Sequence, residues 1–106
     1  MATINDDLTN VLARHVMKWD IGVDRFLMGR RKWIPCWRFQ PMERLEDAFR
    51  LLEVAAPQEY TMSREGPGPF CVRVRISGKT GEARDRSMPR AISLAVSRAL
   101  QIQVDD

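Results

Sequence analysis

Residues 70–77 alternate strictly between apolar side chains and polar or small ones. The apolar set is Phe70, Val72, Val74 and Ile76, and the opposite set is Cys71, Arg73, Arg75 and Ser77. This period of two predicts a β-strand with one buried face, and β-branched residues suit such a half-buried, pleated surface. Pro69 and Gly78 flank the stretch and indicate where the strand ends. We therefore expect the central strand of a small sheet, with helices packed on its apolar face.

Three helices are predicted from apolar residues that recur at helical spacing. They are expected over residues 5–19, 41–56 and 88–101. Pro41 is expected to be the first helical residue of the second helix, where its missing N–H costs nothing, and Ser87 is a suitable N-cap for the third. In the third helix Ala91, Ala95 and Ala99 recur every four residues, so small side chains would let it lie close to the sheet.

Two further strands complete the expected sheet. Residues 58–63 precede a loop rich in glycine and proline and should pair with the central strand as a hairpin. Residues 78–81 read as a second turn, and residues 82–86 as a short, charged edge strand. The expected fold is α+β, with an antiparallel three-stranded sheet and three helices. We expect a single domain over residues 1–106, in which a helix and a basic connection (1–40) precede an α-β-β-β-α unit (41–102).

Composition limits the class of protein. A chain of 106 residues with 44% apolar content can bury one core. We expect no membrane-spanning helix, because no apolar run reaches 18 residues. Residues 1–7 lack the basic and apolar regions of a signal peptide. The two cysteines, Cys36 and Cys71, are expected to be unpaired thiols, and with a single histidine, His15, they do not form a metal-site pattern.

The net charge of +3 is modest, but the bases are concentrated in one segment. Residues 25–38 contain five bases and no acid, and tryptophans are interleaved with them. The bases are Arg25, Arg30, Arg31, Lys32 and Arg38, and the tryptophans are Trp33 and Trp37. Residues 25–28 and 31–34 are expected to be two short extended pieces around a turn. We predict that this segment forms an anion-attracting face, with Arg73 and Arg75 as a secondary basic face.

The alternative for this segment is that the tryptophans fill the core and the bases are only solvated. No catalytic constellation is present in the sequence, so we expect no enzyme and no cofactor. Glu43 and Asp47 are the close acid pair at helical spacing, and periodicity places both on the solvent side. His15 is expected to be a structural or surface histidine.

The order of these elements resembles the phage αβα-sandwich domain found in small phage and prophage proteins. The matching pieces are His15–Trp19, Trp33–Trp37, Pro41–Glu53 with Leu45–Phe49 at its centre, and Ala83–Leu100. Together they cover residues 8–102. The resemblance implies the fold and a phage setting, and it brings no catalytic residues.

Residues 41–101 are also similar to a double-stranded-RNA-binding domain. Gly66-Pro67 falls in the first hairpin loop, where that family often has a Gly-Pro pair. The basic cluster that the family places at the start of its last helix is missing, since Ser87–Arg90 contains one base.

The expected function is that of a non-enzymatic phage accessory protein in the cytoplasm of the bacterial host. It would bind a host protein or an anionic signalling ligand, for example to counteract host defence. The alternative is a nucleic-acid-binding protein of the double-stranded-RNA type. We expect no membrane partner, and the sequence leaves homo-oligomerisation open.

Overall fold

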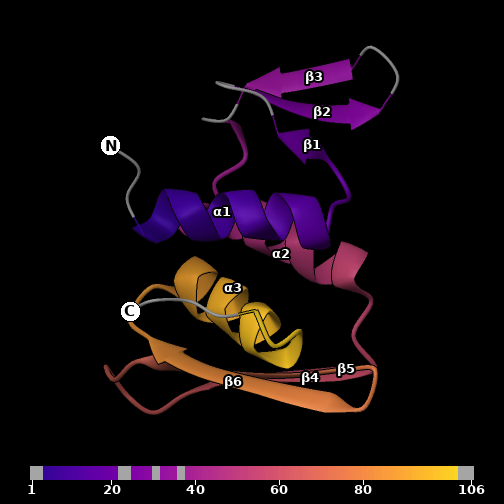
Figure 1. The fold of residues 1–106 in the computed structure, drawn as a ribbon. Coiled ribbons are helices and arrows are strands. Elements are labelled where there is room, and N and C mark those ends of the chain that lie inside the picture. The colour runs from indigo at the N-terminus through magenta and orange to yellow at the C-terminus, as the bar shows by residue number, and fades with distance from the viewer. Residues whose placement is uncertain (1–3, 22–24, 30–31, 36–37, 103–106) are drawn as a thin grey trace.

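The computed structural model describes residues 4–21, 25–29, 32–35 and 38–102. In this part of the chain three helices lie between two antiparallel sheets, one at either end of the molecule (Figure 1). The helices are α1 (Ile4–His15), α2 (Leu45–Ala55) and α3 (Met88–Ala99). The expected α+β class is therefore confirmed, but the described residues contain two sheets where the sequence predicted one.

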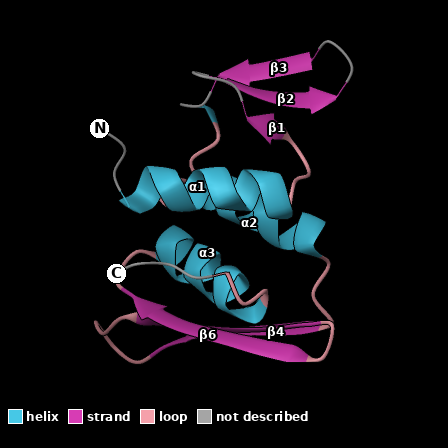
Figure 2. Ribbon diagram, viewed as in Figure 1, coloured by secondary structure: helices cyan, strands magenta, loops and turns pink. Residues whose placement is uncertain are grey.

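The C-terminal sheet consists of β4 (Glu59–Arg64), β5 (Phe70–Ile76) and β6 (Lys79–Asp85). Its order is β4-β5-β6, so the predicted central strand is confirmed, as are both antiparallel partners. Val72, Val74 and Ile76 are buried, whereas Arg73 and Arg75 are exposed. Helix α3 lies on the buried face, and no described helix covers the other (Figure 2). We refer to that uncovered side as the open face.

Helix α3 packs unusually close to β6 because glycine and alanine meet at the contact. A Cβ built on Gly81 would collide with the backbone of α3, namely the Ala95 carbonyl oxygen, the Ala99 nitrogen and, at 2.9 Å, the Ala99 Cα. The prediction that the alanine row brings the helix close to the sheet is thus confirmed. The assignment of Gly81 to a turn was wrong: it is a buried residue of β6.

The N-terminal sheet consists of β1 (Asp20–Ile21), β2 (Arg25–Gly29) and β3 (Lys32–Pro35) in that order. The two predicted extended pieces are β2 and β3, and β1 was not predicted. Phe26 of β2 is buried against Trp19 and Phe39, with ring centroids 5.8 and 6.0 Å away. Trp19 and Phe39 meet edge to face at 5.0 Å. This aromatic cluster joins the sheet to the helices.

The largest differences from the predicted helix boundaries are at the end of α1 and the start of α2. Helix α1 ends at His15, and the chain then passes through Lys18, which has a φ of +61°. The backbone N–H of Trp19 donates to the Ala13 carbonyl at 3.0 Å, so Trp19 is buried although it lies outside the helix. Helix α2 begins at Leu45, and Pro41 lies buried in the preceding turn. The predicted start at Pro41 was therefore wrong.

Helical spacing predicts that Leu45, Ala48, Phe49, Leu52 and Ala56 form the apolar face of α2, but the observed face is shifted. Ala48, Leu51 and Leu52 are buried, whereas Leu45 and Phe49 are exposed. In α3 the N-cap prediction is confirmed, because the Ser87 hydroxyl accepts the Arg90 N–H at 3.4 Å. The helix ends at Ala99, two residues before the predicted boundary.

Replacing Gly81 with valine should lower the free energy of unfolding by about 3 kcal/mol or more, because the new side chain meets rigid helix backbone. The measurement is urea unfolding followed by circular dichroism. Thr80→Val is the matched control, since Thr80 is exposed in the same strand. A Gly81→Val protein as stable as the control would contradict the close packing of α3 on β6.

Candidate functional site

The described part of the basic segment 25–38 consists of strands β2 and β3 and of Arg38. Arg25, Lys32 and Arg38 are exposed, and half of the Trp33 surface (50%) is open to solvent. Arg30, Arg31 and Trp37 lie outside the described residues, as does Cys36. The structure therefore brings one tryptophan and several bases of the predicted face to the surface.

Strand register explains why Arg25 and Trp33 share one side of the N-terminal sheet. Trp33 pairs with Leu27, which lies two residues after Arg25 in β2. Successive side chains of a strand point to opposite sides, so Arg25, Leu27 and Trp33 lie on the side opposite to buried Phe26. The guanidinium carbon of Arg25 lies 5.4 Å from the centroid of the Trp33 ring. Such an exposed cation–π contact contributes about 0.5–1 kcal/mol. It holds a flat aromatic surface and a positive charge side by side.

Trp19 provides an internal comparison for Trp33. It is 6% exposed, packs on Phe26 and Phe39, and lies under the guanidinium of Arg50, whose carbon is 5.6 Å from the ring centroid. Trp19, which lies outside the basic segment, is thus a core tryptophan. The alternative that the tryptophans of the basic segment fill the core does not hold for Trp33, because half of its surface is exposed.

The two arginines of the predicted secondary face are exposed, but both are paired with acids across the sheet. Arg73 donates from Nε (3.3 Å) and Nη2 (3.0 Å) to Glu82 Oε2. Arg75 Nη1 lies 3.6 Å from Glu59 Oε1. The hydrogen bonds and the charge of Arg73 hold the pKa of the Glu82 carboxyl below its ordinary value. Most of the positive charge of this face is therefore compensated.

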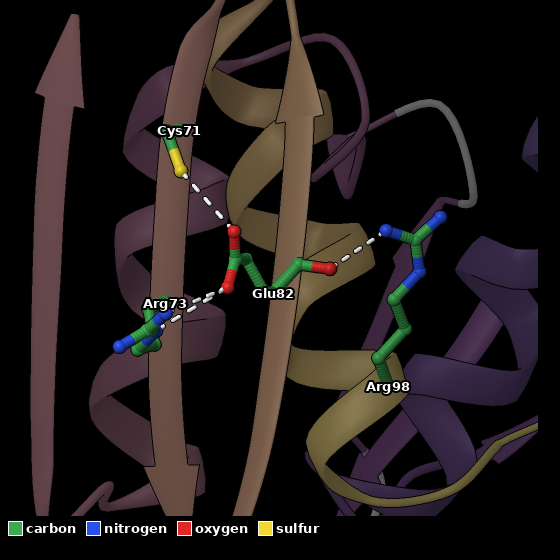
Figure 3. Close-up of polar contacts among 4 residues, drawn as sticks. All are labelled: Cys71, Arg73, Glu82 and Arg98. Atoms are coloured by element: carbon green, nitrogen blue, oxygen red, sulfur yellow. Dashed lines mark hydrogen bonds and ion pairs between the residues drawn. The ribbon is translucent and has the colours of Figure 1, made fainter.

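Glu82 also binds two further groups (Figure 3). Its Oε1 accepts the Cys71 thiol at 3.7 Å, and its backbone carbonyl accepts Arg98 Nη1 at 2.7 Å. Arg98 reaches from α3 to the outer edge of β6, where no described strand pairs with the carbonyl. Cys71 is a free thiol, as predicted. Helical spacing places Arg98 on the outer side of α3 but does not predict this contact.

The two acids that were expected together on the solvent side, Glu43 and Asp47, differ in burial. Glu43 is exposed, but Asp47 is buried, and its Oδ2 accepts the backbone N–H of Gln40 at 2.9 Å. The prediction for Asp47 was wrong, because this carboxylate holds the turn before α2. His15 is exposed.

No metal site emerges from the described residues, where histidine, cysteine and acidic side chains do not gather in threes. Within the same residues, no helix has the length and apolar content needed to cross a membrane.

Replacing Trp33 with alanine should change the free energy of unfolding by less than about 1 kcal/mol, since only an exposed cation–π contact is lost. Trp19→Ala, the control of the same residue type, should cost about 3–5 kcal/mol, because it empties a buried aromatic cluster. Chemical denaturation of both variants measures the difference. Equal losses would mean that Trp33 is a structural residue.

Comparison with known proteins gives a family and a fold. The model of the phage ABA sandwich domain matches residues 10–96. A crystal structure of a phage protein from Bacillus cereus ATCC 14579 is similar, with a TM-score of 0.77 and 17% sequence identity. The similarity covers 99% of this chain and 94% of that one. No curated protein matches.

Neither comparison supports the resemblance to a double-stranded-RNA-binding domain. The single base at the start of α3, Arg90, forms an ion pair with Asp85, whose Oδ2 lies 3.0 Å from Arg90 Nε. The family match covers most of the sequence, and the similarity to the Bacillus cereus phage protein covers almost the whole fold. The chain therefore belongs to the phage ABA sandwich domain family.

Proposed function

We propose that this protein is a non-enzymatic phage accessory protein that binds an anionic partner through the outer side of its β2–β3 hairpin. The binding face comprises Arg25, Arg30, Arg31, Lys32, Trp33, Trp37 and Arg38. Its partner is an acidic surface of a host protein or an anionic signalling ligand in the host cytoplasm, and binding would counteract host defence.

One observation supports this proposal above the others. The Arg25 guanidinium stacks 5.4 Å from the centroid of the Trp33 ring, and half of that ring faces solvent. An exposed tryptophan beside a cation offers an anionic partner both a flat apolar contact and a charge. The stability of the fold does not require this pair, because the core on that side is formed by Phe26, Trp19 and Phe39.

Charge makes the hairpin a better candidate than the open face of the C-terminal sheet. The segment 25–38 has no acid in its sequence. On the open face, Arg73 and Arg75 are opposed by Glu82 and Glu59. A single surface contact between charges contributes only about 1 kcal/mol and is screened by salt. Several bases must therefore act together, which a hairpin with five bases in or beside it allows.

The test is the triple variant Arg30→Glu, Arg31→Glu and Lys32→Glu. The protein is immobilised and exposed to lysate of host cells, and bound proteins, nucleotides and nucleic acids are identified by mass spectrometry. We expect capture of the partner to fall at least about tenfold, the loss of roughly 1.4 kcal/mol of binding free energy. The melting temperature should stay within a few degrees, because Lys32 is exposed and no predicted core stripe includes Arg30 or Arg31.

Arg86→Glu is the control for charge alone, since Arg86 is exposed and lies between β6 and α3. It should capture the partner at full strength. Full capture by the triple variant would refute the proposal and make the acidic helix α2 the next candidate. Salt-sensitive binding of a double-stranded RNA by the wild-type protein, lost in the triple variant, would identify nucleic acid as the anion.

A further inference from the structure

A small cavity opens at one end of the open face of the C-terminal sheet, away from the β2–β3 hairpin. Its volume is about 260 Å³. Ser63, Cys71 and Arg84 line it, and they are direct neighbours across β4, β5 and β6. The β4–β5 loop supplies the remaining wall, including Glu65 and Gly68. Each strand of the sheet thus contributes at least one polar residue to the cavity, and β4 contributes Arg64 as well as Ser63.

Arg84 differs from the other arginines of this face because it has no acidic partner among the described residues. Arg73 is bound to Glu82, and Arg75 is paired with Glu59. Arg84 makes no hydrogen bond or ion pair with the described residues. Its charge acts on Glu82 only through space, and it is the weakest of the influences that lower the pKa of that carboxyl. The five guanidinium N–H donors of Arg84 are therefore available to a ligand.

The loop that forms the cavity wall is held in place by Arg64. Arg64 Nε donates to the Gly68 carbonyl at 2.9 Å, and its guanidinium carbon lies 4.6 Å from the centroid of the Phe70 ring. Gly68 fits tightly, since a Cβ there would lie 3.0 Å from the Glu65 carbonyl oxygen. The wall of the cavity is thus formed before any ligand arrives, which lowers the entropic cost of binding.

Three polar residues that line the cavity, Arg84, Ser63 and Glu65, favour different chemical groups of a ligand. A guanidinium matches the oxygens of a phosphate in a forked geometry. The Ser63 hydroxyl can donate to the same group, whereas the Glu65 carboxylate repels phosphate and accepts hydrogen bonds from hydroxyl groups. A ligand that satisfies all of them has a phosphate at one end and hydroxyls at the other. The volume is below the usual range for drug-sized ligands, so the ligand is small.

We propose that this cavity binds a small hydroxylated phosphate monoester, with Arg84 and Ser63 on the phosphate and Glu65 on the hydroxyl groups. The site is independent of the proposed hairpin face and stands whether or not that proposal holds.

The experiment is isothermal titration of the full chain with glycerol 3-phosphate, inorganic phosphate and glycerol as separate probes. We expect glycerol 3-phosphate to bind best and glycerol not to bind. Arg84→Gln should weaken the binding of glycerol 3-phosphate at least about tenfold, the usual effect of losing one charge-assisted hydrogen bond. Arg86→Gln, the matched control, should bind as the wild type does.

Two further measurements check the geometry. Glu65→Ala should improve the binding of inorganic phosphate and reduce the preference for glycerol 3-phosphate, because a like charge and a hydroxyl acceptor are removed together. Alkylation of Cys71, localised by peptide mass spectrometry, should slow when glycerol 3-phosphate is bound to the wild type. This second readout needs no variant and does not depend on the folding of Arg84→Gln.

Three outcomes would overturn the proposal. The first is no binding of glycerol 3-phosphate by the wild type at about 10 mM, which corresponds to a binding free energy weaker than roughly 3 kcal/mol. The second is unchanged affinity in Arg84→Gln. The third is loss of binding in the triple hairpin variant with Arg84 intact, which would place the phosphate on the β2–β3 hairpin.

Discussion

The close approach of helix α3 to the C-terminal sheet is the contact on which the other layers depend. Gly81 has no side chain, so the helix backbone at Ala95 and Ala99 can lie directly on β6. The opposite side of α3 packs against α2. There the buried Ser93 hydroxyl donates to the Pro41 carbonyl at 2.7 Å. Displacing α3 by the width of a methyl group would therefore disturb the sheet, the turn before α2 and the core between them.

At the exposed edge of the same sheet, Glu82 binds groups from three neighbouring residues. Glu82 neutralises Arg73 and accepts the Cys71 thiol, while its backbone carbonyl is closed off by Arg98 from α3. Unpaired strand edges invite pairing with other chains, and charged side chains discourage it. Because Glu82 is bound to Arg73, Arg84 is left beside the cavity without an ion pair among the described residues. The proposed phosphate site follows from this distribution of partners.

The N-terminal sheet has one side that packs on the core and one side that is open to solvent. Its inner side contributes Phe26 to the aromatic cluster, and its outer side shows Arg25 and Trp33. The strand period makes this division possible, because adjacent residues point in opposite directions. The outer side can therefore change its chemistry without changing the core. A family fold can accommodate different binding surfaces in this way.

The sequence by itself determined the features that depend on local periodicity and local turn chemistry. The central strand, its two partners, the Ser87 cap, the alanine row of α3 and the two extended pieces of the basic segment all followed from it. Such patterns are visible because the period of a strand or helix is fixed by backbone geometry. The family was also recognisable from the order of these pieces.

Only the tertiary structure decided which of these residues work together. The sequence could not show that Trp33 is exposed, that Asp47 holds a turn, or that Arg73 is paired with an acid whereas Arg84 has no ion pair among the described residues. Nor could it show that Gly81 touches a helix that begins seven residues later. These properties depend on strand register and on partners far apart in the chain, and the energies that set them arise only when distant segments pack together.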